Sequence, residues 1–385
     1  MKRARFGSMA TALLLGGAVA YAAVKPRARQ LGVPFDGTPG PQNAITDVRG
    51  VEVGHSTIIR GDGPLKVGQG PVRTGVTAVL PRGATSDGDP VFSGWFSQNG
   101  NGEMTGTTWV EESGFLEGPV MITNTHSVGT VRDEVIAWRV RRGAADKTGY
   151  WWSLPVVAET WDGELNDVNG FHVKPAHVDE ALSSAKGGPV PEGNVGGGTG
   201  MICYGFKGGI GTASRRLPAG EGGYTVGVLV QCNCGRKRDL LIAGVPVGRE
   251  IAGSGARDAD SGSIIIVVAT DAPLLPHQLK RLTRRATMGL ARTGSVSGNG
   301  SGDIFIAFST ANPGAGAAEA EARVTMLPNG AMDPLFTATV QATEEAIVNA
   351  MVAAETMTGA NGVTVRALPH DGLRRALEKY NRLAK

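Results

Sequence analysis

Short apolar runs recur along the chain and are separated by turn-forming residues. Runs of four to eight β-branched and aliphatic residues with such boundaries are typical of buried strands. The sequence predicts strands of this kind at 76–80, 120–123, 224–230, 263–270 and 304–308.

Three segments follow the spacing of a helix instead. In 276–291 the leucines fall on one stripe and the basic residues lie elsewhere. A longer helix is expected from Asp333, a capping residue, through apolar positions as far as Met357, with a stop at Gly359. A last helix is predicted at about 371–380. Because these strands and helices do not alternate as a regular βαβ repeat, the pattern favours layered α+β elements over a doubly wound sheet.

Glycine is the unusual feature of the composition. It supplies 58 of the 385 residues, roughly twice its usual share of about 7%, so we expect many turns and close backbone contacts. The segment 183–192 is predicted to be a surface loop, and it leads into a glycine-rich stretch at 193–200. That stretch is no phosphate loop, because the next lysine, Lys207, is followed by Gly208 rather than Ser or Thr. We expect it to form a tight turn or to pack its backbone closely against a site.

The N-terminus has the three parts of a secretory signal. Residues 1–22 combine a basic start (Lys2, Arg3 and Arg5), an apolar run and small residues at the end. Export to the periplasm or the medium is therefore expected, with an uncleaved N-terminal anchor as the alternative. The net charge of +3 includes these three basic residues, so the rest of the chain is neutral and gives no electrostatic reason to expect nucleic-acid binding.

Cysteine and histidine do not indicate a metal site. Cys203, Cys232 and Cys234 are too few for a disulfide framework in a chain of this size, and we expect them to be buried and structural. The six histidines are scattered and include no metal-binding helix motif.

The candidate chemistry lies at Gly262-Ser263, where a small residue precedes a serine that opens an apolar strand. The chain offers no convincing Gly-x-Ser-x-Gly elbow of the lipase type. If the chain were cut between Gly262 and Ser263, this serine would carry both a hydroxyl and an α-amine with a pKa of roughly 7.7–8.0. Nucleophile and base would then belong to one residue.

This dipeptide and five other motifs, six in all, occur together and in order. They are 98–106 (QNGNGEMTG), 159–167 (ETWDGELND), 193–201 (GNVGGGTGM), 228–233 (VLVQCN), Gly262-Ser263 and Ser301-Gly302-Asp303. With them the chain closely resembles the family of L-aminopeptidase D-amidase/esterases and β-peptidyl aminopeptidases, which mature by self-cleavage. The resemblance covers nearly all of the chain from Gly32 onward.

The resemblance implies a fold and a chain organisation. The fold is a four-layer αββα sandwich that resembles the N-terminal-nucleophile hydrolases but has different connectivity. Self-cleavage would divide one catalytic domain into an α chain, 23–262, and a β chain, 263–385. The processed αβ units of this family usually assemble into a homotetramer, and no metal ion or organic cofactor is needed.

The resemblance also implies roles for individual residues. Ser263 is the nucleophile, and Ser301 bridges its amine to the acid Asp303. Asn233 supplies the oxyanion-hole amide, and Trp161 stands where the family has an aromatic donor. Within the same motif as Trp161, Glu159 is our candidate for holding the free amine of the substrate.

Two of these positions depart from the family pattern. Family members usually carry Glu where Asp303 stands, and Tyr is common where Trp161 stands. Asp is shorter by one methylene, so its link to Ser301 is expected to need a small backbone shift or a water molecule. The indole of Trp retains one N–H donor, so support for the oxyanion is expected to survive.

The expected function is that of an exported, self-processing serine aminopeptidase. Its substrates would be short peptides, amides or esters with a free amine, and their acyl part would be an L-α, D-α or β-amino acid. Two alternatives remain open at this point. One is an acyltransferase with the ornithine acetyltransferase fold, which would normally use Thr and has no reason for a signal peptide. The other is a non-catalytic exported binding protein.

Overall fold

The computed structural model describes residues 25–86, 88–143, 152–253, 262–317 and 320–384. The predicted signal segment, 1–22, lies outside the described residues. Within the described residues, no helix is both long enough and apolar enough to span a bilayer.

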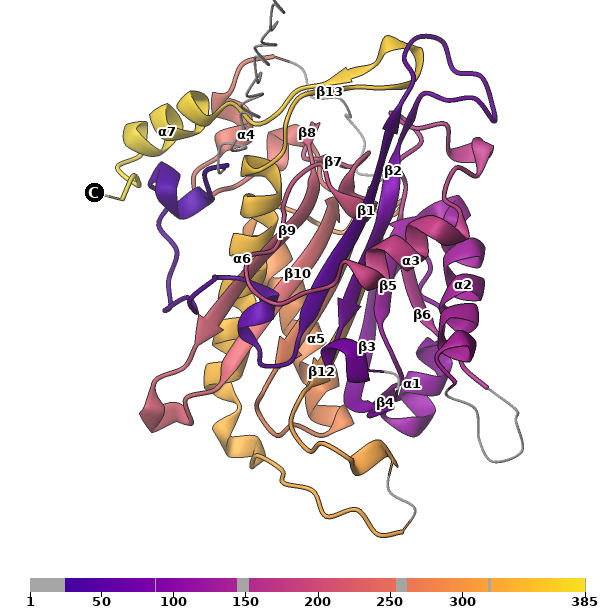
Figure 1. Cartoon of the computed structure of the whole chain (residues 1–385). Helices are drawn as coiled ribbons and strands as arrows, with labels where there is room; N and C mark the ends of the chain where they lie inside the picture. The colour runs from indigo at the N-terminus through magenta and orange to yellow at the C-terminus, as the bar shows by residue number, and fades with distance from the viewer. Residues whose placement is uncertain (1–24, 87, 144–151, 254–261, 318–319, 385) are drawn as a thin grey trace, which may run out of the picture.

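Two sheets form the centre of the molecule (Figure 1). The first has four strands in the order β1-β2-β5-β6, namely Glu52–Arg60, Val72–Leu80, Val120–Asn124 and Val156–Thr160. The second has six strands in the order β4-β3-β12-β11-β10-β9, namely Phe115–Leu116, Val91–Gly100, Gly302–Ser309, Ser263–Thr270, Thr225–Asn233 and Gly209–Arg216. Two short hairpins, β7-β8 and β13-β14, comprise Ile202–Cys203, Phe206–Lys207, Met357–Thr358 and Thr364–Val365.

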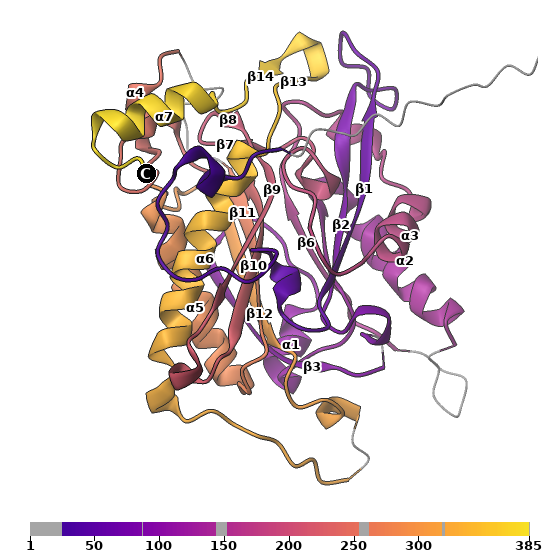
Figure 2. The same cartoon turned by 60° about the vertical axis from the view of Figure 1, so that its left-hand side comes forward.

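Helices cover the outer face of each sheet, which gives four layers. On one side α5 and α6 pack against the six-stranded sheet, and on the other side α2 and α3 pack against the four-stranded sheet (Figure 2). The helices are α1 Thr107–Ser113, α2 Val128–Arg141, α3 Pro175–Ser183, α4 Val247–Glu250, α5 Pro276–Arg292, α6 Asp333–Val352 and α7 His370–Lys379.

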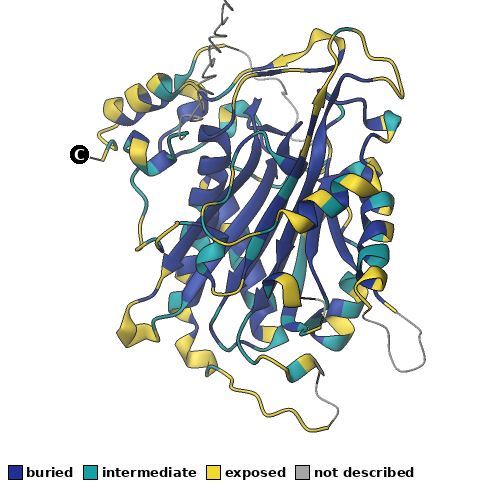
Figure 3. Cartoon of the chain, viewed as in Figure 1, coloured by how far each residue is buried: buried dark blue, intermediate teal, exposed yellow. Residues whose placement is uncertain are grey.

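Apolar residues fill the interfaces between these layers. Ile265, Val267 and Ala269 of β11 point into the core between the sheets, while Ile264 and Ile266 point toward the helices α5 and α6. Since both faces of this strand are covered, its continuous apolar run is explained. Figure 3 shows the buried strands at the centre and the exposed outer faces of the helices.

The αββα sandwich predicted from the resemblance is therefore present. Four of the five predicted strands lie within observed strands, and β11 has the predicted bounds. The fifth, predicted at 224–230, begins one residue before β10. The helices α5 and α7 also lie within one residue of their predicted bounds.

The prediction for the long helix was wrong at its C-terminal end. The helix α6 ends at Val352 rather than at Gly359, and Met357 belongs to the strand β13. The side chain of Asn194 accepts a hydrogen bond from the backbone N–H of Glu355 and donates one to its carbonyl. These two bonds hold the chain in a non-helical course after the helix. Asp333 is the first helical residue, not the cap.

Elements from both sides of Gly262 share one sheet. The strand β11 pairs with β10 on one side and with β12 on the other, and β12 pairs in turn with β3 from the N-terminal part of the chain. The residues before and after the proposed cleavage point thus form a single folded unit.

Candidate active site

Three neighbouring strands bring the candidate residues to one edge of the six-stranded sheet. Asn233 is the last residue of β10, and it pairs directly with Ser263, the first residue of β11. The strand β12 runs parallel to β11, so Asp303 near its start lies opposite Ile264. Because β10 runs antiparallel to both, its end and their beginnings meet at the same edge.

Ser263 lies beside the start of β12. Its Oγ accepts a hydrogen bond from the backbone N–H of Gly302 at 3.1 Å. The two neighbours of Gly302 are also joined, because the buried Ser301 hydroxyl donates to Asp303 Oδ1 at 2.6 Å. The shorter acid therefore reaches Ser301 directly, and the pairing of β12 with β3 shifts register between Asp303 and Ile304.

The amide of Asn233 is held at both of its polar atoms. Its Oδ1 accepts from the backbone N–H of Ile202 at 2.8 Å, and its Nδ2 donates to the backbone carbonyl of Trp161 at 2.9 Å. An amide nitrogen carries two hydrogens, so the Asn233 amide can donate a second hydrogen bond to an oxyanion.

Trp161 contacts Asn233 through its backbone. Its indole ring lies against Gly163, where an added Cβ would stand 2.2 Å from a ring carbon. The ring also meets His126 edge-on, with centroids 6.1 Å apart. The ring lines the same cavity as Ser263, and its role as a second oxyanion donor stays a prediction.

Glu159, in β6, is a buried carboxylate in the lining of this cavity. Its Oε1 accepts from the backbone N–H of Glu103 at 3.0 Å, and its Oε2 accepts from the hydroxyl of Thr125. Burial raises the pKa of Glu159 above the ordinary value, while these two hydrogen bonds oppose the shift. The side chain is thus fixed in place, and each of its oxygens has a further lone pair for a ligand.

The cavity itself has a volume of about 570 Å³ and is lined by acidic and polar groups. Glu103 and Glu164 join Glu159 and Ser263 in its wall. A cavity with three glutamates and a serine in its lining suits a small cationic ligand.

Two glycines at the site are required by close contacts. A Cβ at Gly262 would lie 1.8 Å from the carbonyl oxygen of Asn233, and a Cβ at Gly302 would lie 2.3 Å from the carbonyl oxygen of Asn101. No side chain fits at either place. The peptide that precedes Ser263 is thereby pressed against the residue expected to supply the oxyanion donor.

The structure adds residues that sequence reasoning did not single out. Thr125 and Glu103 orient Glu159, and Gly302 contributes the N–H that bonds Ser263. Glu103 and Gly302 lie inside motifs that carried the resemblance, which was a usable signal. Thr125 follows β5 in a short turn, and nothing in the sequence marks it.

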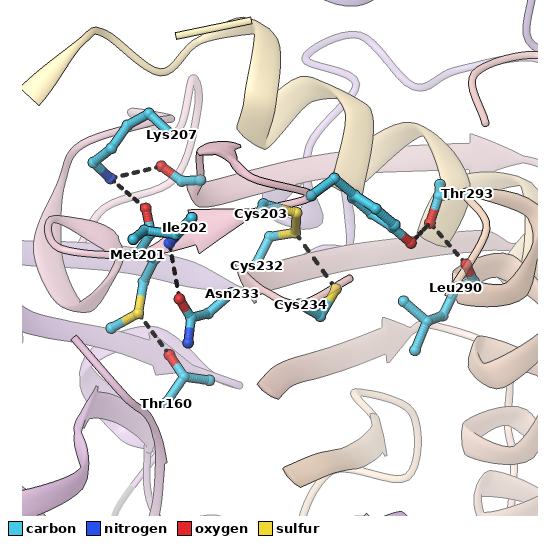
Figure 4. The surroundings of a disulfide bond; sticks show 12 residues. Thr160, Met201, Ile202, Cys203, Lys207, Cys232, Asn233, Cys234, Leu290 and Thr293 are labelled. Carbon is cyan, nitrogen blue, oxygen red and sulfur yellow. Dashed lines mark hydrogen bonds between the residues drawn. A yellow bond between two sulfur atoms is a disulfide. The ribbon is translucent and has the colours of Figure 1, made fainter. Parts of the chain in front are cut away.

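The three cysteines are buried, as predicted, and lie next to Asn233. Two of them form a disulfide that the sequence did not predict. Cys203 and Cys232 are joined, and the sulfur of Cys234 lies 4.0 Å from that of Cys232 (Figure 4). The three sulfurs lie within 4.8 Å of one another. We treat the cluster as structural, since two of its three sulfurs are bonded to each other.

Comparison with known proteins shows which family the chain belongs to. The model of peptidase family S58 matches residues 43–365. The chain belongs to peptidase family S58. It is 55% identical to the β-peptidyl aminopeptidase BapA of Sphingosinicella microcystinivorans, over 99% of this chain and 98% of that protein. It is 50% identical to the BapA of Sphingosinicella xenopeptidilytica, over 96% and 95% of the two chains.

Solved structures agree with the family assignment. The L-aminopeptidase D-Ala-esterase/amidase of Ochrobactrum anthropi, described as a prototype serine aminopeptidase with a variant of the Ntn hydrolase fold, superposes with a TM-score of 0.86. It is 50% identical to this S58 peptidase, and the match covers 94% of this chain and 100% of that one. A Burkholderia β-aminopeptidase gives a TM-score of 0.84 at 48% identity, over 92% and 99% of the chains.

These findings decide between the functions left open by the sequence. The S58 protein is a hydrolase of the aminopeptidase class, with a fold related to that of the Ntn hydrolases. They favour neither the acyltransferase nor the non-catalytic binding protein.

Proposed function

We propose that this S58 peptidase is an exported, self-processing serine aminopeptidase that releases an N-terminal amino acid through an acyl-enzyme on Ser263. The observation that carries the proposal is the position of Ser263. Its hydroxyl lies in the wall of an acidic cavity, and it directly follows a glycine that is packed against Asn233.

Self-cleavage requires Ser263 Oγ to attack the carbonyl carbon of Gly262. The C–N bond then breaks, the former amide nitrogen takes a proton and becomes the α-amine of Ser263, and Gly262 is left as an ester on Oγ. Hydrolysis of that ester frees the Gly262 carboxylate and the Ser263 hydroxyl. The bare Cα of Gly262 leaves room for the attack where any side chain would collide with Asn233.

In the processed enzyme the new α-amine acts as the general base. It accepts the proton of the Ser263 hydroxyl as Oγ attacks the substrate carbonyl, and it returns a proton to the departing amine. The bonded pair Ser301–Asp303 lies next to Gly302, which contacts Ser263, so it is placed to orient the amine. Asn233 donates to the oxyanion, and a donor of this kind contributes about 2.7 to 4 kcal/mol.

Glu159 selects substrates with a free amine. A protonated amine at the cavity wall would form a charge-assisted hydrogen bond with this fixed carboxylate. The relatives are named for β-peptides and for L-amino acid and D-Ala substrates, so the acyl part is a β-amino acid or a small α-amino acid. One methylene discriminates by only about 1 to 3 kcal/mol, and activity on more than one class is expected.

Export and assembly complete the proposal. The basic and apolar pattern of residues 1–22 supports secretion to the periplasm or the medium. Family resemblance supports a homotetramer of processed αβ units. N-terminal sequencing of the mature α chain and light scattering test these two statements.

The deciding experiment is the chain composition of the purified protein. Wild type should show two chains, the smaller of which begins at Ser263, and it should hydrolyse aminoacyl p-nitroanilides. Ser263→Ala should remain one chain without activity. Full activity in an uncut wild-type chain would overturn the role of Ser263.

A further inference from the structure

Lys207, in the short strand β8, is a fully buried lysine with no part in the proposed mechanism. Its Nζ donates to the backbone carbonyls of Met201 at 2.8 Å, Gly208 at 2.9 Å and Gly198 at 3.4 Å. Lysine is almost never fully buried unless its charge is compensated. Burial lowers the pKa of Lys207 to about 7, and the nearby Asp162 carboxylate opposes that shift. Because burial of an ammonium group is unfavourable, we looked for a role that accounts for this lysine.

Two hydrogen bonds, which share one peptide unit, connect Lys207 to Asn233. Lys207 binds the carbonyl of Met201, which belongs to the peptide unit whose N–H is that of Ile202. That same N–H donates to Asn233 Oδ1 at 2.8 Å. A peptide unit is planar and rigid, so fixing its carbonyl also fixes the direction of its N–H. Figure 4 shows Lys207, Met201, Ile202 and Asn233 in this sequence.

Asp162 lies next to the other contact of the Asn233 amide. Asn233 Nδ2 donates to the carbonyl of Trp161, whose peptide unit contains the nitrogen of Asp162. The Asp162 side chain is buried and accepts hydrogen bonds from Asn124 at 3.1 Å and from Asn166 at 3.0 Å. One of the two peptide units that bind the Asn233 amide is thus bonded to Lys207 through its carbonyl, and the other contains the nitrogen of Asp162. The Lys207 and Asp162 side chains are electrostatically coupled.

We propose that Lys207 is a positioning residue for the oxyanion donor: it fixes the peptide that orients the Asn233 amide toward the reacting carbonyl. This inference rests on the proposed role of Asn233 and adds a residue that never touches the substrate. Without the ammonium group, the carbonyls of the 198–208 turn lose a common donor, and the Ile202 N–H is free to tilt.

The Cys203–Cys232 disulfide allows the orientation of the Asn233 amide to change without unfolding of the two strands. Cys203 follows Ile202, and Cys232 precedes Asn233, so the Cys203–Cys232 bond ties the two backbones together beside the hydrogen bond in question. Loss of Lys207 is thus expected to change the orientation of the amide while the two strands stay joined.

The test compares Lys207→Met and Lys207→Gln with wild type. Turnover is measured on an aminoacyl p-nitroanilide and normalised to the amount of processed chain. For Lys207→Met we expect kcat to fall about 10- to 100-fold, less than the roughly 10²- to 10³-fold loss of a whole oxyanion donor, while KM stays within about twofold. The Gln variant keeps an N–H donor and should recover part of kcat.

Non-additivity separates this role from a general structural one. In an Asn233→Ala background, Lys207→Met should lower kcat by less than about twofold, since the donor it orients is already absent. Arg215→Met is the control for loss of a buried cation, because Arg215 is also buried and donates to the carbonyls of Asp36, Ser214 and Gln341, although it pairs in addition with the Glu345 carboxylate at 2.7 Å. It should lower the melting temperature without lowering kcat per folded enzyme.

Three outcomes would overturn the proposal. These are a folded Lys207→Met variant with wild-type kcat, a loss that is fully additive with Asn233→Ala, and an equal loss in Arg215→Met. If neither Lys207 variant folds, replacement of the 202 peptide N–H by an ester oxygen removes the donor to Asn233 while Lys207 stays in place. Unchanged kcat in that variant overturns the proposal as well. Wild-type kcat in Asn233→Ala alone would instead refute the proposed oxyanion role.

Discussion

Substitution of Glu159 by Gln tests why this enzyme should require a free amine. Glu159 is buried, and its two oxygens accept hydrogen bonds from the Thr125 hydroxyl and the Glu103 backbone N–H. Gln keeps the shape of the side chain but removes its charge and one acceptor. We expect the change to weaken the binding of a protonated amine and to spare an N-acetylated substrate.

The magnitude follows from the environment of the carboxylate. Truncating one partner of a buried, hydrogen-bonded charge pair costs about 2 to 5 kcal/mol. At about 1.4 kcal/mol per factor of ten, the lower limit corresponds to roughly 30-fold in kcat/KM. The variant should fold well, because removal of a buried carboxylate whose pKa is raised by burial removes a cost of folding.

The dependence on pH provides a second readout. Only the ionised carboxylate anchors an amine, and burial raises the pKa of Glu159 above its ordinary value. As pH falls through that raised pKa, KM for a free-amine substrate should rise, and it should do so at a higher pH than for an exposed glutamate. This acidic limb should be absent in Glu159→Gln.

The assay compares a free and an N-acetylated aminoacyl p-nitroanilide on wild type, Glu159→Gln and the matched control Glu103→Gln. Glu103 lines the same cavity with an exposed side chain, and its substitution should change the preference by no more than a few fold, as expected for a screened charge. If wild type cleaves both substrates equally, or if Glu159→Gln keeps the preference for the free amine, Glu159 is not the anchor.

Three further predictions concern processing and the catalytic base. Gly262→Ala should block self-cleavage, since its Cβ would lie 1.8 Å from the Asn233 carbonyl oxygen. Gel electrophoresis checks this, and two chains in the variant would contradict it. Asp303→Asn should lower kcat by about fivefold, because the hydrogen bond from Ser301 loses its charge assistance. An unchanged kcat would refute a role for Asp303 in catalysis. With the Ser263 α-amine as base, activity should rise through its pKa, roughly 7.7–8.0 before environmental shifts, and no single histidine substitution should abolish turnover in a folded, processed enzyme.

Some elements of the fold could be predicted from local pattern because burial alone specifies them. The strand β11 is covered on both faces, so its apolar run marks it fully. The strand β3 gives no such signal. It contains Ser93, which is buried because its hydroxyl donates to the carbonyl of Ala307, and Gly94, which lets the backbone of α5 approach closely. Only tertiary contacts make that sequence a strand.

The same contrast holds at the active site. Gly262-Ser263 can be noticed in the sequence because a strand begins directly after a glycine. Its assignment as the cleavage site depended on the other motifs that resemble a known family. The sequence gives no sign that Lys207 and Asp162 are buried. Their charges are accommodated by carbonyls and amides from several loops, and such a set exists only after the chain has folded.

The sheet explains how one cleaved bond could create a finished active site. Ser263 is paired with Asn233 of β10, and its hydroxyl is bonded to Gly302 of β12. Both contacts would persist when the bond to Gly262 breaks, because neither uses the carbonyl of that residue. The new amine would therefore appear where the peptide nitrogen already stood, on the residue whose hydroxyl contacts Gly302, between Ser301 and Asp303 in the sequence. The strand ends that hold Gly262 against Asn233 would thus also hold the product of the proposed cleavage in position for catalysis.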